Sequence, residues 1–104
     1  MDFLRARLDE DEVRQRNSLA QWHAPGCASL DSERPFPCDC GVPARVLAEV
    51  AAKRERIRLW NGLRVLREGG GHEYDLAYGT ATKSLQLDAA VYSAHPDYDE
   101  RWRP

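Results

Sequence analysis

The sequence predicts an all-α fold with three helices, and three observations lead to this prediction. Apolar residues recur at helical spacing in the long segments of the chain, which is the pattern of a helix that buries one side. Proline and glycine are concentrated between these segments, where they end helices and form turns. No segment shows a convincing alternation of apolar and polar residues, as a β-strand would. A chain of 104 residues has room for one modest core, so we expect residues 1–104 to form a single helical domain.

The first helix is expected over residues 2–22. Asp2 is a suitable N-cap, acidic residues cluster early, and neither glycine nor proline occurs before Pro25. Few residues make up its apolar stripe: Leu4, Leu8 and Leu19, with Phe3 beside them. We therefore expect a charged surface helix that packs along one narrow stripe.

The second helix is expected over residues 43–68. Pro43 suits the first turn of a helix, and the glycines at 69–71 supply a stop. Five apolar residues share one side at helical spacing: Val46, Leu47, Val50, Ile57 and Val65.

Further apolar residues of the second helix lie away from that stripe, namely Leu59, Trp60, Leu63 and Leu66. They need cover from the third helix or from a partner, which includes a second copy of the chain. Trp60 and Leu63 are therefore candidate partner-binding residues.

The third helix is expected over residues 74–94, with Pro96 as its end. Two stripes follow one another along it with a small rotation between them: Tyr74, Ala77, Tyr78, Ala81 and Leu85, then Leu87, Ala90, Val91 and Ala94. The first half is a weaker helix because Gly79, Thr80 and Thr82 are poor helix formers.

Charge is unevenly distributed along the chain. Residues 45–68 hold seven basic and three acidic residues, whereas residues 72–104 hold three basic and six acidic ones. Packing of these two segments against each other would explain the difference. The alternative is a nucleic-acid-binding surface on the second helix, with four basic residues directed at phosphate: Lys53, Arg54, Arg56 and Arg58. Acidic residues among these bases and a net charge of −2 make nucleic acid the less favoured partner.

The loop between the first two helices gathers all three cysteines and one histidine within eighteen residues. The four candidate metal ligands are His23, Cys27, Cys38 and Cys40. A Cys3His set is one of the usual ligand sets of structural zinc, and the neighbouring prolines and glycines form turns that let ligands converge. An iron–sulfur cluster would want a fourth cysteine. The other interpretation is three ordinary thiols, free or buried. If all four residues bind one zinc ion, the site is closed and structural, not catalytic.

No catalytic motif is evident in the sequence. The segment that begins at His72 resembles HExxH, but Leu76 stands where the second histidine belongs. The segment that ends in Lys83 and Ser84 lacks the glycine of a phosphate-binding loop. We expect no catalytic residues and no enzymatic activity.

The C-terminal segment contains Tyr98 and Trp102, two large amphipathic side chains. They are expected to fold back and complete the helical core. The alternative is an exposed aromatic and arginine patch that binds a partner, which makes Tyr98 and Trp102 further candidate partner-binding residues.

Apolar runs are too short to span a membrane, which takes about 20 residues. The first residues, MDFLRARLDEDE, lack the apolar region of a signal peptide. We therefore expect a cytoplasmic protein with reduced thiols and no membrane partner.

Three blocks of sequence resemble a family of small uncharacterised proteins from actinobacteria and their phages, which is catalogued as a domain of unknown function. The blocks are FLRARLDEDE, PARVLAEVAAKRERI and YSAHPDYDERWRP, and together they cover 38 of the 104 residues. The resemblance implies a helical, cytoplasmic bacterial or phage protein and brings no activity, cofactor or site residue with it. The family varies in length around the cysteine loop, so a metal site need not be shared by all its members.

From these observations we expect a non-enzymatic helical protein that acts by binding another macromolecule, most simply a protein. The alternative is a zinc-stabilised nucleic-acid-binding module that uses the basic second helix. One structural zinc ion is the only cofactor that the sequence suggests.

Overall fold

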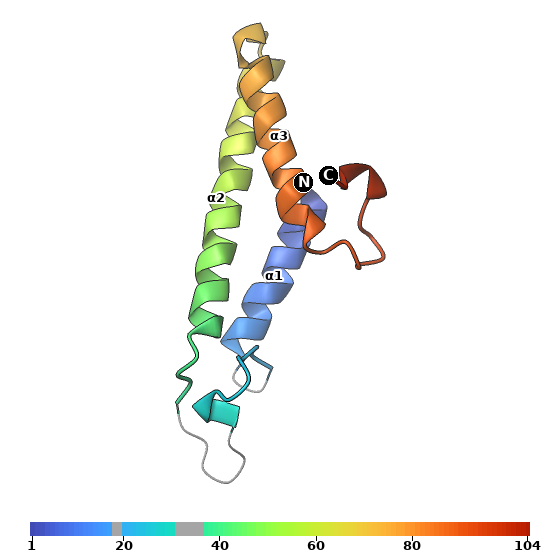
Figure 1. Cartoon of the computed structure of the whole chain (residues 1–104). Helices are drawn as coiled ribbons and strands as arrows, with labels where there is room; N and C mark the ends of the chain where they lie inside the picture. Colours follow the sequence, from blue (N-terminus) through green and yellow to red (C-terminus); the bar gives the residue numbers. More distant parts are fainter. Residues whose placement is uncertain (18–19, 31–36) are drawn as a thin grey trace.

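A computed structural model describes residues 1–17, 20–30 and 37–104 of the chain. Three helices make up the described part: α1 (Asp2–Arg16), α2 (Val42–Glu68) and α3 (Asp75–Ala90) (Figure 1). Three short 3-10 turns accompany them, at Ala28–Leu30, His72–Tyr74 and Glu100–Trp102. The described residues contain no strand. The predicted all-α class with three helices is therefore confirmed.

The first helix is shorter than the predicted 2–22 and ends at Arg16. Asn17 leaves the helical conformation, with φ −97° and ψ 107°. The side-chain amide of Gln21 donates a 2.6 Å hydrogen bond to the carbonyl of Gln15, so the chain turns back over the end of the helix. Leu19, which was expected to extend the apolar stripe, lies outside the described residues.

The second and third helices differ less from the prediction. α2 begins one residue early, at Val42, and ends at Glu68 as expected. α3 begins at Asp75 instead of residue 74 and ends at Ala90 instead of residue 94. Beyond Ala90 the chain continues in turns, because hydrogen bonds there join residues three apart, as between the Tyr92 N–H and the Ala89 carbonyl.

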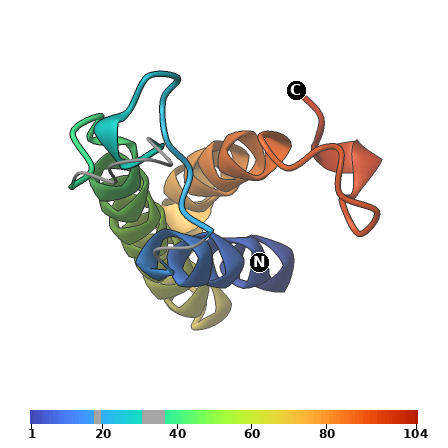
Figure 2. The ribbon, with the colours of Figure 1, turned by 90° about the horizontal axis from the view of Figure 1, so that it is seen from below.

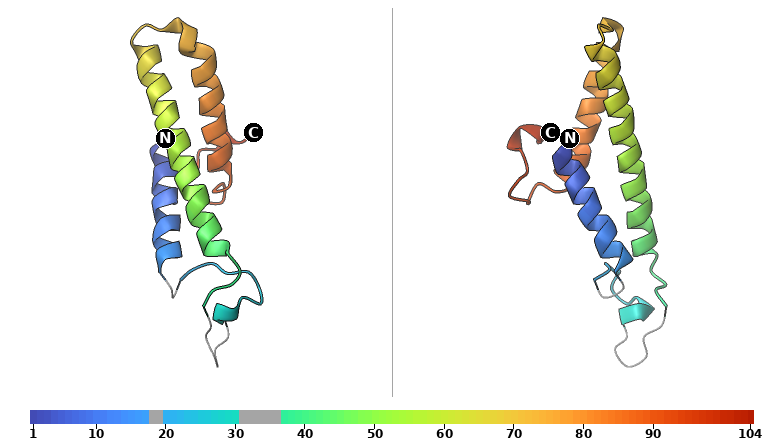
Figure 3. Two further views of the ribbon diagram at one scale, coloured as in Figure 1. Left: turned by 90° about the vertical axis from the view of Figure 1, so that its left-hand side faces the viewer. Right: turned by 180° about the vertical axis from the view of Figure 1, so that it is seen from behind.

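The long α2 is the axis of the molecule. α1 lies along the half of α2 that leads from the cysteine loop, and α3 runs back along the other half (Figures 1 and 3). Seen from below, α1 lies on one side of the α2–α3 pair (Figure 2). The result is a narrow body of 62 × 24 × 18 Å.

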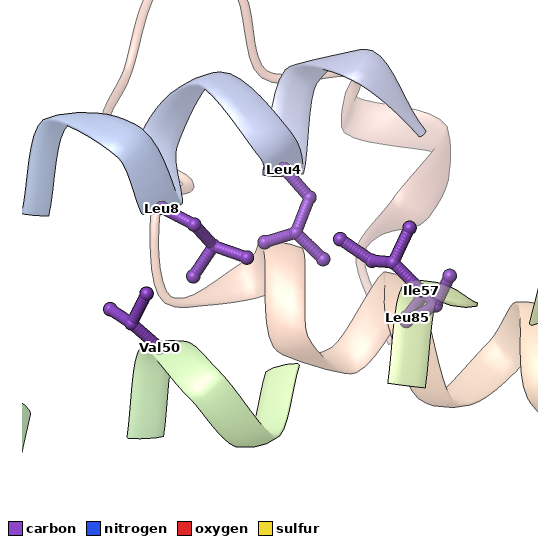
Figure 4. Close-up of a cluster of buried hydrophobic side chains, with 5 residues drawn as sticks. All are labelled: Leu4, Leu8, Val50, Ile57 and Leu85. Atoms are coloured by element: carbon purple, nitrogen blue, oxygen red, sulfur yellow. The ribbon is translucent and has the colours of Figure 1, made fainter. Parts of the chain in front are cut away.

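The core lies where α1 and α3 overlap along α2. Five side chains from all three helices meet there, each at most 4% exposed: Leu4, Leu8, Val50, Ile57 and Leu85 (Figure 4). The predicted stripe of α2 is correct for Val50 and Ile57 but wrong for Val65, which is 56% exposed. Val65 lies three residues before the end of α2.

Among the described residues, no helix combines the length and the apolar character that a membrane span requires.

Candidate metal centre

The four predicted metal ligands meet at one point of the loop between α1 and α2. One ligand atom from each of His23, Cys27, Cys38 and Cys40 lies within 4.8 Å of all the others. His23 Nδ1 is 3.5 Å from Cys27 Sγ, 3.3 Å from Cys38 Sγ and 3.6 Å from Cys40 Sγ. Cys38 Sγ is 3.6 Å from each of the other two sulfurs. These residues therefore form a group that could hold a metal ion.

Five of the six distances within this group are close to the edges of a tetrahedral zinc site. Zinc binds thiolate sulfur at about 2.3 Å and histidine nitrogen at about 2.05 Å, so a tetrahedron has S–S edges of about 3.8 Å and S–N edges of about 3.6 Å. The five edges given above lie between 3.3 and 3.6 Å. All three cysteines are free thiols.

The first arm of the site is shaped by a tight turn. The Cys27 N–H donates a 3.0 Å hydrogen bond to the Ala24 carbonyl. Pro25 and Gly26 occupy the two central positions, and Gly26 has φ +84°, as the third residue of a type II turn requires. The turn reverses the chain between His23 and Cys27, which brings their side chains together.

The second arm of the site leads directly into α2. Gly41, with φ +73°, is the N-cap of that helix and follows Cys40 immediately. A hydrogen bond of 2.9 Å from the Ala28 N–H to Asp39 Oδ1 joins the second arm to the first. The candidate metal ligands Cys38 and Cys40 are therefore joined directly to the start of α2.

The surroundings of two of the three sulfurs, those of Cys27 and Cys40, favour thiolates. The hydroxyl of Ser29 lies 3.1 Å from Cys27 Sγ. This hydrogen bond and backbone N–H groups, including those of Ser29 and Asp39, lower the pKa of Cys27 to about 6. Backbone N–H groups of Ala24 and Val42 lower the pKa of Cys40.

The other two ligands respond to the same surroundings. Burial raises the pKa of Cys38. The hydrogen bond with Cys40 raises the pKa of His23. The protonated, cationic form of His23 is therefore favoured beside these sulfurs.

Ser29 and Asp39 were not singled out from the sequence, although they support the ligands. Their only signal is position, since each lies one or two residues from a cysteine. Trp22, at the start of the first arm, packs its ring on the guanidinium of Arg14 at 5.1 Å from the centroid. This contact holds the first arm against the end of α1.

The basic residues proposed for nucleic-acid binding are engaged within the chain. Arg54 donates to Asp9 at 2.7 Å and to Glu12 at 2.5 Å, which joins α2 to α1. Arg56 donates two hydrogen bonds, of 2.8 and 3.0 Å, to Asp88 of α3.

The remaining two bases are held more loosely. Arg58 pairs with Glu55, with one of their two hydrogen bonds at 2.9 Å. Lys53 lies over the ring of Tyr92, with Nζ 5.9 Å from the centroid. Residues 45–68 carry an excess of basic residues and residues 72–104 an excess of acidic ones. The ion pair between Arg56 of α2 and Asp88 of α3 neutralises part of both.

The C-terminal aromatic side chains fold back on α1. Tyr98 is buried, 8% exposed, and Trp102 is half-buried. The ring of Phe3 lies 5.9 Å from that of Tyr98 and 5.4 Å from that of Trp102. Tyr98 and Trp102 thus form an aromatic cluster with α1.

Trp60 is covered by α3. Its ring stacks on Tyr78, with centroids 6.0 Å apart, and its Nε1 donates a 3.0 Å hydrogen bond to Thr82. Leu63 is half-buried and lines a groove between α2 and α3.

A second surface was only partly anticipated from the sequence. It lies on the α2–α3 hairpin and is called here the outer hairpin face, made up of Leu59, Leu63, Leu76, Ala77, Thr80, Ala81, Ser84 and Leu87. Leu59, Leu76 and Leu87 are 55%, 82% and 49% exposed. Leu59 follows the buried Ile57, and Leu87 the buried Leu85, by two residues, or about 200° of helix rotation. This face therefore points away from the core.

Comparisons with known proteins identify a family but no function. A family described as "Family of unknown function (DUF6221)" matches residues 1–104. No curated protein and no solved structure matches the chain.

Proposed function

The chain belongs to the DUF6221 family, whose function is unknown, and we propose that it is a zinc-stabilised helical module that acts by binding another protein and not by catalysis. The observation that carries this proposal is the group of one histidine and three cysteines in the loop before α2, whose ligand atoms all lie within 4.8 Å of one another.

A structural zinc ion suits these residues better than a catalytic one. Structural sites are closed by four protein ligands, whereas catalytic sites keep a position for water or substrate. Here one nitrogen and three sulfurs supply a complete set. The hydrogen bonds to Cys27 and Cys40 favour the thiolate form that zinc binds.

The bound ion would fix how α1 connects to α2. The arms that contain Cys27 and Cys40 contribute little apolar surface, and the nearest part of the hydrophobic core is Val50. The free energy of metal binding would replace the missing hydrophobic stabilisation of this end, as in small zinc domains. The bound zinc ion would therefore hold the first turn of α2 in place.

The proposal of protein binding rests on the outer hairpin face of α2 and α3. Large apolar side chains are exposed along the outer hairpin face, and a groove of about 420 Å³ lies between its leucines and alanines. Exposed apolar surface that is contiguous is typical of interaction sites. Two charged groups at its edge, Arg56 and Asp75, are already paired within the chain.

The proposed setting is the cytoplasm of a bacterial cell, which is the host cell if the gene is carried by a phage. Three thiolates remain available to zinc in a reducing compartment. The resemblance to actinobacterial and phage proteins supports the same setting.

Metal content of untagged protein tests the zinc site. Elemental mass spectrometry should find about one zinc ion per chain, and the variant Cys38→Ser with Cys40→Ser should have lost it. Ser84→Ala, far along α3 from the loop, is the matched control and should keep the metal. Wild-type protein without metal, at full cysteine reduction, would contradict the proposal.

Protein binding is tested with the zinc-loaded chain as bait. Wild type should capture a protein that a variant with Leu59→Glu does not, because a buried, unpaired carboxylate at an interface weakens binding. Capture of nothing by wild type, in the absence of self-association, would contradict this part of the proposal.

A further inference from the structure

We propose that the metal centre is also a site of reversible oxidation: a hydroperoxide oxidises Cys38, Cys27 then forms a disulfide bond with it, and the zinc ion is released. The inference rests on the proposed function, because it names the regulation of the same site. The three sulfurs of the site differ in exposure and in the residues that hold them, and these differences assign their roles.

Exposure makes Cys38 the sulfur that an oxidant meets first. Cys38 is exposed, Cys40 is intermediate, and Cys27 is buried, with 5% of its surface exposed. Zinc binds cysteine as the thiolate, and the thiolate is the form that peroxides oxidise. Oxidation of thiolates follows their access to solvent. The oxidant is therefore expected to react with Cys38 and not with the buried sulfur of Cys27.

Position makes Cys27 the sulfur that completes the disulfide bond. Cys27 Sγ lies 3.6 Å from Cys38 Sγ, so the two atoms have to approach by about 1.6 Å to form an S–S bond. The hydrogen bond of 2.9 Å from the Ala28 N–H to Asp39 Oδ1 joins the residues that follow the two cysteines. This bond uses no ligand atom, so it holds the pair together independently of the ion.

Cys40 is the less suitable partner, although its sulfur also lies 3.6 Å from that of Cys38. Only Asp39 separates the two residues, so a disulfide bond between them would close a short ring and bend the backbone at Asp39. The side chain of Asp39 is held by its bond to Ala28. A bond between Cys27 and Cys38 closes a loop of 12 residues, which needs no such bend.

The oxidant supplies the whole redox change. The Cys38 thiolate attacks one oxygen of the hydroperoxide: an S–O bond forms, the O–O bond breaks, and the leaving oxygen takes a proton from solvent. The Cys27 thiolate then attacks the sulfur of the Cys38 sulfenic acid: the S–S bond forms, the S–O bond breaks, and the hydroxide that leaves is protonated to water. The two thiolates lose two electrons, and the hydroperoxide gains them.

The disulfide bond would remove two of the four metal ligands. His23 and Cys40 remain, which is half of the set that a structural zinc ion requires. Cys40 directly precedes Gly41, the N-cap of α2, so release of the ion would also remove the link between His23 and the start of that helix. A dithiol reductant and fresh zinc should restore the original state.

Peroxide titration of the zinc-loaded full chain tests the inference. Elemental mass spectrometry records the zinc content before oxidation. About one equivalent of hydrogen peroxide should then release the zinc, detected with a chromophoric indicator, because one peroxide oxidises two thiolates. Peptide mass mapping of the same sample should find the main disulfide bond between Cys27 and Cys38.

Two matched variants separate the roles of the sulfurs. Cys38→His and Cys40→His each leave two cysteines and two histidines, which is another usual ligand set of structural zinc, so both should retain the ion. Cys40→His keeps the proposed pair and should release zinc at nearly the wild-type rate. Cys38→His lacks the exposed sulfur and should release it at least about tenfold more slowly. Circular dichroism checks that both variants are folded.

The outcomes also separate this inference from the proposed function. A zinc-loaded wild type that keeps its zinc under peroxide, a main disulfide bond that includes Cys40, or equal release rates from the two variants would each overturn the inference alone. If a variant does not retain zinc, the disulfide bond mapped in wild type is sufficient to support or overturn it. A chain without zinc before oxidation would contradict the proposed zinc site and this inference together.

Discussion

Tyr92 donates a hydrogen bond of 2.5 Å from its hydroxyl to Oδ2 of Asp11, and this bond joins the turn after α3 to α1. The ring of Phe3 packs edge-on to Tyr92, with centroids 6.4 Å apart. Burial and, next, the hydrogen bond to Asp11 raise the pKa of Tyr92. The two helices that flank α2 are therefore connected directly as well as through α2.

The raised pKa gives a prediction at alkaline pH. The folded pKa of Tyr92 lies above its unfolded value of about 10, so its contribution to stability is fully present below pH ~10 and is lost as pH rises through the folded pKa. An absorbance titration of the tyrosines should show one component that ionises at higher pH than an ordinary tyrosine, whose pKa is about 10. Tyr92→Phe should remove this component. The control Tyr74→Phe should keep it. At neutral pH we expect Tyr92→Phe to lower the free energy of unfolding by ~1 kcal/mol.

Gln15 gives a prediction of increased stability. Its side chain is 1% exposed, and neither its amide nitrogen nor its amide oxygen has a hydrogen-bond partner among the described residues. A buried polar group without a partner costs roughly 1–3 kcal/mol. Gln15→Met keeps a similar shape without polar atoms, so the free energy of unfolding in urea should rise by ~1 kcal/mol. Gln15→Ala should lower it, because it leaves a cavity. A destabilised Gln15→Met variant would contradict this account.

Gly26 gives a prediction for the metal centre. Its φ of +84° is unfavourable for alanine by roughly 1–2 kcal/mol, and a Cβ atom there would meet no neighbour within 4 Å. Gly26→Ala should therefore weaken zinc binding roughly five- to thirtyfold, as measured by competition with a chromophoric chelator.

The same substitution inside α2 should act in the opposite direction. Gly62 also has open space around it, and it lies within a regular helix. Gly62→Ala should raise thermal stability, by up to ~1 kcal/mol, without changing zinc affinity. Equal zinc affinities for Gly26→Ala and wild type would show that the turn does not position the ligands.

The ion pairs of α2 give a prediction about nucleic acid. Phosphate contacts by Arg54 and Arg56 would have to replace their bonds to Asp9, Glu12 and Asp88. We therefore expect no mobility shift of DNA or RNA even at low salt. Arg54→Gln with Arg56→Gln should instead lower stability. A salt-dependent shift that this double variant abolishes would restore the nucleic-acid interpretation.

The sequence was informative wherever neighbouring residues decide the structure. The four candidate metal ligands lie within eighteen residues, and the Pro25–Gly26 turn lies between the first two of them, so short-range structure brings those two together. The long α2 was predicted to within one residue because Pro43 and Gly69 mark its ends. Its stripe predicted Val50 and Ile57 in the core for the same reason.

Contacts between distant residues decide what the sequence could not predict. The end of α1 at Arg16 is a local exception: the Gln21 side chain bonds the Gln15 carbonyl six residues earlier, and no sequence pattern marks such a bond. α3 ends at Ala90, before a turn in which Tyr92 reaches Asp11 across 81 residues of sequence. Val65 is exposed although it follows the stripe of α2, and periodicity carries no information on which part of a helix is covered.

The three tryptophans lie in three different parts of the molecule. Trp22 contacts Arg14 beside the metal centre, Trp60 stacks between α2 and α3, and Trp102 belongs to the aromatic cluster with Phe3. Each single-tryptophan variant would therefore carry a fluorophore that reports on one region alone. Stopped-flow emission after mixing with a chelator would show whether loss of the ion loosens only the loop or spreads to the far end of the hairpin.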